Sequence, residues 1–164
     1  MAETTNTTNQ FAGNIDLSAL RKKRFTVDGD ESRVLELNTS DFSIINRLSD
    51  SYPRLNDLAE KITNIDEGIT GGEDEESMKA DVDTLSERLS EWDAEIRNLI
   101  DYIFDSNVCE VCCTTGSMVD IINGTFRYEV IINSLMTLYE TNINKEVDKL
   151  QKRMSKHTDK YTRR

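Results

Sequence analysis

The stretch that decides the fold is Ser77–Phe104, SMKADVDTLSERLSEWDAEIRNLIDYIF. Its apolar residues recur at alternating intervals of three and four, and charged side chains fill most of the positions between them. That spacing places the apolar residues along one seam of an amphipathic α-helix over about three heptads. The seam consists of Val82, Leu85, Leu89, Trp92, Ile96, Leu99 and Ile103. We therefore expect a long helix here and a protein that is mainly α-helical.

A second long helix is predicted from about Thr125 to at least Met154. Its first half is apolar over a wide face, and its second half carries only a narrow stripe with intervals of three and four residues. Such a helix leaves a packed core and continues as a projecting amphipathic arm. The stripe consists of Ile143, Val147, Leu150, Met154, His157 and Tyr161. We expect the two long helices to form an antiparallel pair.

The N-terminal part contains the best candidates for strands. Phe25–Leu37 alternates apolar and polar residues on both sides of Asp28-Gly29, which is typical of a β-hairpin. The acidic residues after Gly29 predict a loop of four to five residues. A single hairpin is marginally stable, so it has to pack on helices. Two short helices are expected after it, because Tyr52-Pro53 interrupts the helical pattern.

These patterns divide the chain into four segments. Residues 1–20 form a flexible N-terminal arm, and residues 21–66 form the β-hairpin and the two short helices. Residues 67–76 are an acidic, glycine-rich linker, and residues 77–164 are a long-helix hairpin with a basic C-terminal tail. The predicted fold class is mainly α with a small N-terminal β-hairpin: a helical bundle with two long antiparallel helices and a projecting C-terminal helix.

Charge is distributed unevenly over the 164 residues, whose formal net charge is −11. Residues 28–120 hold 24 acids and seven bases, whereas residues 144–164 hold eight bases and three acids. The basic end is either a solvated helix surface or a complementary contact with another copy or an acidic partner. Nucleic acid is disfavoured as a partner, because the acidic body repels phosphate.

No membrane or secretory segment is expected. No apolar run approaches the length of a transmembrane helix, and the N-terminus has no apolar signal region. Cysteines in a chain of this kind are expected to be reduced thiols rather than a disulfide framework.

The sequence contains no constellation that indicates catalysis or a metal site. Three cysteines form the pattern C-x-x-C-C, but a zinc site lacks a fourth ligand and the flanking Asp105 and Glu110 disfavour a reactive thiolate. We interpret them as small buried residues. They are Cys109, Cys112 and Cys113. The single histidine, His157, has no nucleophile near it in the sequence. We predict no catalytic residue, no metal and no cofactor.

Apolar helix faces are the candidate binding surfaces. The seam of the first long helix has two interpretations: the inner face of a bundle within one chain, which we favour, or a surface for self-association or a partner. The stripe on the projecting helix is the better candidate, because little chain remains to cover it. The predicted partner-binding residues are Trp92, Ile96, Leu99, Ile143, Val147, Leu150, Met154 and Tyr161.

Two stretches resemble known phage proteins. Arg24–Leu37 (RFTVDGDESRVLEL) resembles the opening of small proteins encoded among phage tail genes. Ile100–Phe104 (IDYIF), a break, and the apolar helix FRYEVIINSLMTLYE resemble the C-terminal half of tail assembly chaperones of long-tailed (siphophage-type) bacteriophages. The resemblance covers Arg24 to Glu140. Family members usually have glycine where Asp105 stands, and the cysteines are not a feature of the family.

The resemblance implies a non-enzymatic role in virion morphogenesis. Such chaperones bind the long, hydrophobic tape measure protein in the host cytoplasm and keep it soluble until tail tube subunits polymerise around it. The alternative is a structural virion protein of the head–tail region, which binds neighbouring subunits through its N-terminal arm and its basic C-terminal helix. A homo-oligomer is compatible with both roles.

Overall fold

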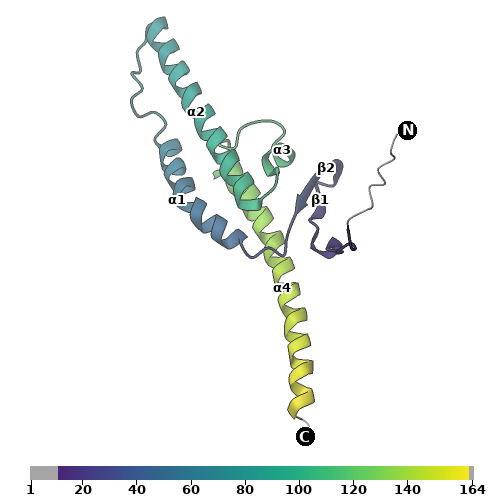
Figure 1. The fold of residues 1–164 in the computed structure, drawn as a ribbon. Helices are drawn as coiled ribbons and strands as arrows, with labels where there is room; N and C mark the ends of the chain where they lie inside the picture. Colours follow the sequence, from purple (N-terminus) through teal and green to yellow (C-terminus); the bar gives the residue numbers. More distant parts are fainter. Residues whose placement is uncertain (1–10, 163–164) are drawn as a thin grey trace, which may run out of the picture.

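The computed structural model describes residues 11–162 and places side chains as far as residue 156. The molecule is elongated: helix α2 (Glu75–Phe104) reaches one end and helix α4 (Arg127–Thr162) reaches the other (Figure 1). Helix α1 (Ile44–Thr63) lies beside α2, and the β-hairpin lies at the middle of the molecule. The predicted class, mainly α with a small N-terminal β-hairpin, is confirmed.

Strands β1 (Lys23–Val27) and β2 (Asp30–Leu37) form the predicted antiparallel hairpin. The last residue of β1 pairs with the first residue of β2, so Asp28 and Gly29 alone make the turn. Both have positive φ, 54° and 73°, the backbone conformation of a tight two-residue turn that Asp-Gly adopts readily. The predicted loop of four to five residues is wrong, because a shift in register at the end of β1 absorbs the extra residues.

Helix α1 is one helix of 20 residues with Pro53 inside it, so the prediction of two short helices is wrong. Proline in a helix interior costs about 3 kcal/mol. Ile44, Leu55 and Leu58, on both sides of Pro53, are buried in the core. Burying three such side chains favours folding by about 5–9 kcal/mol, which outweighs the cost of the proline.

Helices α1 and α2 are the antiparallel pair of this fold. Near the start of α1, Arg47 Nε donates to the carbonyl of Ile103 at the end of α2 (2.7 Å). Beyond the other end of α1, the carbonyl of Ile65 accepts from Arg88 in the first half of α2 (2.9 Å). The glycine-rich segment between the helices leads directly into α2, which begins two residues earlier than expected.

Helix α4 runs alongside the C-terminal half of α2 in the same direction, which corrects the expected antiparallel pairing of the two long helices (Figure 1). At the start of α4, Arg127 contacts the Cys113 thiol, which Arg97 of α2 also contacts. Further along both helices, the rings of Phe104 and Tyr139 pack together with their centroids 5.7 Å apart. The reason for the difference is the connection, which returns along α2 before α4 begins.

The connection contains helix α3 (Val108–Cys112) and the short strands β3 (Ile121–Ile122) and β4 (Thr125–Phe126). Arg33 of β2 donates to the carbonyls at the end of α3 at 3.0–3.2 Å, which joins the hairpin to this segment. The core lies where α1, α2, β2 and the connection meet the first half of α4. Its largest fully buried side chains include Leu35, Leu37, Ile44, Leu58, Ile96, Ile100, Ile103, Phe104, Met118 and Tyr139.

The segment before the hairpin contains only a short 3₁₀ turn, η1 (Ser18–Leu20). Its apolar side chains are exposed: Phe11, Ile15, Leu17 and Leu20. The first ten residues of the predicted flexible arm lie outside the described residues.

Candidate functional site

An apolar groove lies between α1 and α4. Its volume is about 410 Å³, and it is lined mainly by aliphatic and aromatic side chains, with Asn56, Glu129 and Asn133 as its polar members. We call it the α1–α4 groove. Its apolar lining consists of Leu48, Tyr52, Leu55, Tyr128, Ile132 and Met136.

The spacing of residues within the two helices explains why these side chains meet. Three of the residues on α1 lie four and three positions apart, and three on α4 lie four apart, so each set occupies one helix face. At the base, Tyr128 is buried and stacks on Phe126 with ring centroids 5.4 Å apart. Burial raises the pKa of Tyr128 to about 12, so this ring stays neutral at physiological pH. At the rim, Tyr52 is exposed.

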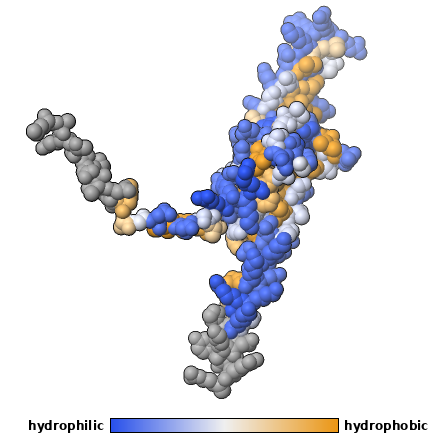
Figure 2. Space-filling model, turned by 90° about the vertical axis from the view of Figure 1, so that its right-hand side faces the viewer, coloured by the Kyte–Doolittle hydropathy of each residue, from blue (hydrophilic) through white to orange (hydrophobic). Residues whose placement is uncertain are grey.

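The apolar face of α4 continues beyond the groove. Tyr139 is buried against α2, and Ile143 and Val147 are then half-buried. Leu150 and Met154 are exposed. Together Ile143, Val147, Leu150 and Met154 form what we call the arm stripe. The projecting part of α4 is otherwise mostly hydrophilic in Figure 2, as the narrow stripe in the sequence predicts.

A second, open hollow lies on the N-terminal half of α2. Its volume is about 460 Å³, and Val82, Leu85 and Leu89 supply its apolar lining. In Figure 2, hydrophobic (orange) surface is visible on the upper part of the molecule. Met78, one turn before Val82, is also exposed. We call Met78, Val82, Leu85 and Leu89 the upper stripe.

The predicted partner-binding residues on α2 do not form one exposed surface. Ile96 is fully buried in the core, so it is not available to a partner in this fold. Leu99 and Trp92 are half-buried against the core. Trp92 lies in a shallow hollow with Lys61 and Arg88, beside the end of α1. The heptad seam is therefore the inner face of the bundle in its C-terminal part, as we favoured.

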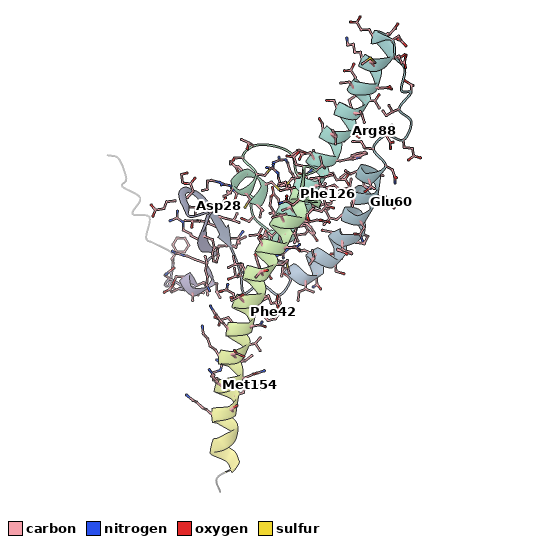
Figure 3. All side chains as sticks on the ribbon, turned by 180° about the vertical axis from the view of Figure 1, so that it is seen from behind. Asp28, Phe42, Glu60, Arg88, Phe126 and Met154 are labelled. Carbon is pink, nitrogen blue, oxygen red and sulfur yellow. The ribbon has the colours of Figure 1, made fainter. Side chains whose placement is uncertain are left out.

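The predicted residues on α4 do share one face. The arm stripe is brought together on the projecting part of the helix, where Figure 3 labels Met154. The side chains of His157 and Tyr161, the remaining members of the predicted stripe, lie outside the described residues.

The cysteines are free thiols inside the connection. Cys109 and Cys113 are buried and Cys112 is half-buried. Burial raises the pKa of Cys109 well above its usual range, and the nearby carboxylate of Asp101 raises it further. Burial also raises the pKa of Cys112. The burial of Cys109 and Cys113 agrees with the interpretation from the sequence, but their surroundings are partly polar. Cys113 Sγ accepts from Arg97 (3.5 Å) and Arg127 (3.8 Å), and Cys109 Sγ donates to the carbonyl of Arg97 (3.5 Å).

A network of charged side chains fixes the connection to α2. Asp93 accepts from the backbone N–H of Met118 (2.6 Å) and from the Ser117 hydroxyl (3.0 Å) with one oxygen, and from Arg97 (2.8 Å) with the other. Burial alone raises the pKa of Asp93, but the three hydrogen bonds together outweigh it and lower the pKa. Arg127 extends the network by its ion pair with Asp120 (2.9 Å).

Within the described part of the chain, no cluster of three or more histidine, cysteine and acidic side chains is arranged to hold a metal ion. None of the helices in that part has the length and apolar character needed to cross a bilayer.

Comparison of the chain with protein-family models, with curated proteins and with solved structures finds no match.

The α1–α4 groove was not predicted as a binding surface. Ile132 and Met136 belong to the wide apolar face of the second long helix, and Leu48 to the expected helix before Pro53. The excess width of that face is the signal that could have found the groove, because a helix needs only part of such a face for packing on one neighbour. Tyr52 gave no signal, because the proline after it pointed to a helix end.

Proposed function

We propose that this protein is a non-enzymatic phage morphogenesis protein, a tail assembly chaperone that binds the tape measure protein through apolar helix faces. The observation that carries the proposal is the α1–α4 groove and its continuation along α4 as the arm stripe. An amphipathic helix can lay its apolar face into such a groove. A tape measure protein offers long helices of this kind.

Charge supports the same role. The acidic body keeps the chain, and a complex containing it, soluble through net repulsion. Apolar side chains that stay exposed on a free chain are typical of surfaces that bind another protein. The resemblance of Arg24–Leu37 and of residues 100–140 to phage tail proteins supplies the identity of the partner.

The test is co-expression with the tape measure protein of the same phage. The wild-type chain is expected to keep the tape measure protein in the soluble fraction and to co-purify with it. Tyr52→Glu, at the exposed rim of the groove, is expected to reduce co-purification at least about tenfold, because a buried unpaired charge costs more than about 1.4 kcal/mol. Tyr102→Glu is the matched control, because Tyr102 is similarly exposed on α2 but is not part of the groove.

Mass spectrometry of purified phage particles separates this role from the alternative. A chaperone is expected to be absent from finished particles. A fixed copy number in the particles, together with no effect of the wild-type chain on the solubility of the tape measure protein, would overturn the proposal in favour of a structural virion protein.

A further inference from the structure

The upper stripe and the arm stripe have the same spacing. In the upper stripe, Met78, Val82, Leu85 and Leu89 are separated by four, three and four residues. In the arm stripe, Ile143, Val147, Leu150 and Met154 are separated by the same intervals. Two helices whose apolar residues repeat every 3.5 residues interdigitate along their seams at a shallow angle of about 20°. The two stripes are therefore geometrically suited to each other.

The lengths of the two helix segments also match. The part of α2 that bears the upper stripe, residues 75–93, has 19 residues and is about 28 Å long. The part of α4 from Ile143 to its end has 20 residues and is about 30 Å long. One segment can therefore cover the other along its whole length.

The charges around the two stripes are opposite. Residues 75–93 carry seven acids and two bases, a net charge of −5. Residues 143–164 carry eight bases and three acids, a net charge of +5. Opposite charges along two facing helices favour encounter and fix the pairing, whereas two copies of either segment would repel each other. This disfavours symmetric pairing of arm with arm or of upper stripe with upper stripe.

The two stripes of one chain cannot meet. They lie at opposite ends of the molecule, and α4 continues as one helix without a break that would let the arm fold back (Figures 1 and 3). Contact between them therefore requires a second copy. We propose that the arm stripe of one copy docks on the upper stripe of the next, in a head-to-tail contact.

The direction of α4 fits this arrangement. Within one chain, the first half of α4 lies alongside the second half of α2, and the hollow of the upper stripe is bounded by Ser117 of the connection that leads to α4. A copy shifted along the long axis places its arm beside the first half of α2, in the same direction. Because the two surfaces differ, the contact repeats and builds a chain of copies or a ring.

This inference is separate from the proposed function. A tape measure helix and a second copy would compete for the arm stripe, but self-association is measured on the purified protein alone. Failure of one proposal therefore leaves the other intact.

The test uses two full-length variants, each with one stripe disrupted. Val82→Asp disrupts the upper stripe and Leu150→Asp disrupts the arm stripe, and both positions are exposed enough for the variants to fold. Sedimentation velocity is expected to show that the wild-type chain associates with rising concentration and less so at high salt. Each variant alone is expected to be a monomer. Their equimolar mixture is expected to form a 1:1 dimer, because only one intact junction remains.

Circular dichroism verifies that both variants keep the helical content of the wild type. Ile45→Asp, at a similarly exposed position on α1, is the control and is expected to associate like the wild type. Deletion of residues 1–20 is also expected to leave association unchanged; the exposed apolar side chains of residues 11–20 are the other candidate occupant.

Four results would overturn the proposal. They are a wild-type chain that stays monomeric at low salt, a single variant that still associates like the wild type, two folded variants that do not form a dimer when mixed, and loss of association when residues 1–20 are deleted.

Discussion

The two halves of α2 carry one seam but have different surroundings. In the C-terminal half, Ile96 and Ile103 of the seam and the neighbouring Ile100 are fully buried by α1, the connection and α4. In the N-terminal half, Val82 is 62% exposed and lies in an open hollow. The heptad spacing is the same in both halves. The spacing therefore predicts the helix and its apolar face, but the rest of the chain decides whether that face belongs to the core or to a partner.

The prediction with the largest expected effect compares how much the two halves of α2 contribute to the free energy of unfolding. Ile100→Ala leaves a cavity in the core and is expected to lower the free energy of unfolding by about 3 kcal/mol. Val82→Ala removes a side chain that is already exposed and is expected to change it by less than about 0.5 kcal/mol. Urea denaturation of both variants measures the difference. Equal effects would contradict the comparison.

A second prediction concerns the connection, residues 105–126, which follows α2 and helps to bury its C-terminal half. Gly116 has φ +83°, and a Cβ there would lie 2.7 Å from Asp120 Oδ2 and 2.8 Å from Arg127 Nη2. Gly116→Ala is expected to lower the free energy of unfolding by about 2 kcal/mol, because the new methyl group strains the backbone and also displaces the ion pair between Asp120 and Arg127. Gly124→Ala is the matched control: its φ is +78°, the space around it is open, and we expect about 1 kcal/mol. Thermal unfolding at a fixed protein concentration measures the loss of stability in both variants. Equal losses for Gly124→Ala and Gly116→Ala would show that displacement of the ion pair contributes nothing.

A third prediction concerns Asp93, where the two halves of α2 meet. Because its pKa is lowered in the folded state, its carboxylate contributes stability that is fully present above its unfolded pKa of about 4 and is lost as the pH falls through the folded value. Asp93→Asn is expected to cost about 1–2 kcal/mol at pH 7, because it breaks the ion pair with Arg97. The difference from the wild type is expected to shrink as the pH falls below about 4. Denaturation of both proteins at pH 7 and pH 3 measures it, and an unchanged or larger difference at pH 3 would refute the role of the carboxylate.

The smallest expected effect extends the comparison to α4. Leu150 is 45% exposed on the arm stripe, so Leu150→Ala is expected to change the free energy of unfolding of the monomer by less than about 0.5 kcal/mol. The measurement is urea denaturation at high salt and low protein concentration, where association is weakest. A cost near that of Ile100→Ala would mean that the arm is part of the core.

Local patterns predicted most of the elements. The heptad seam predicted α2, and the wide and then narrow apolar face predicted α4 and its projecting part. Asp28-Gly29 predicted the hairpin. Pro53 misled the prediction of α1, because burial of residues on both sides of it is a tertiary effect that the sequence does not display.

The direction of α4 relative to α2, and the segments that each apolar helix face contacts, were harder to predict. The path of residues 105–126, which makes α4 parallel to α2, depends on long-range contacts such as those of Arg97 and Arg127 with Cys113. The α1–α4 groove depends on residues about 80 positions apart in the chain. Ile96 belonged to the same seam as Val82, and only the fold separates the buried residue from the exposed one.

The central claim is that the protein acts by presenting apolar helix surface to another chain. Hydrogen–deuterium exchange of the full-length protein, alone and in complex with the co-expressed tape measure protein, tests it most directly. The account predicts that added protection is concentrated in residues 48–56 and 128–136 and continues along α4 beyond residue 143. Protection confined to the connection, residues 105–126, with none along the groove or the arm stripe, would contradict it.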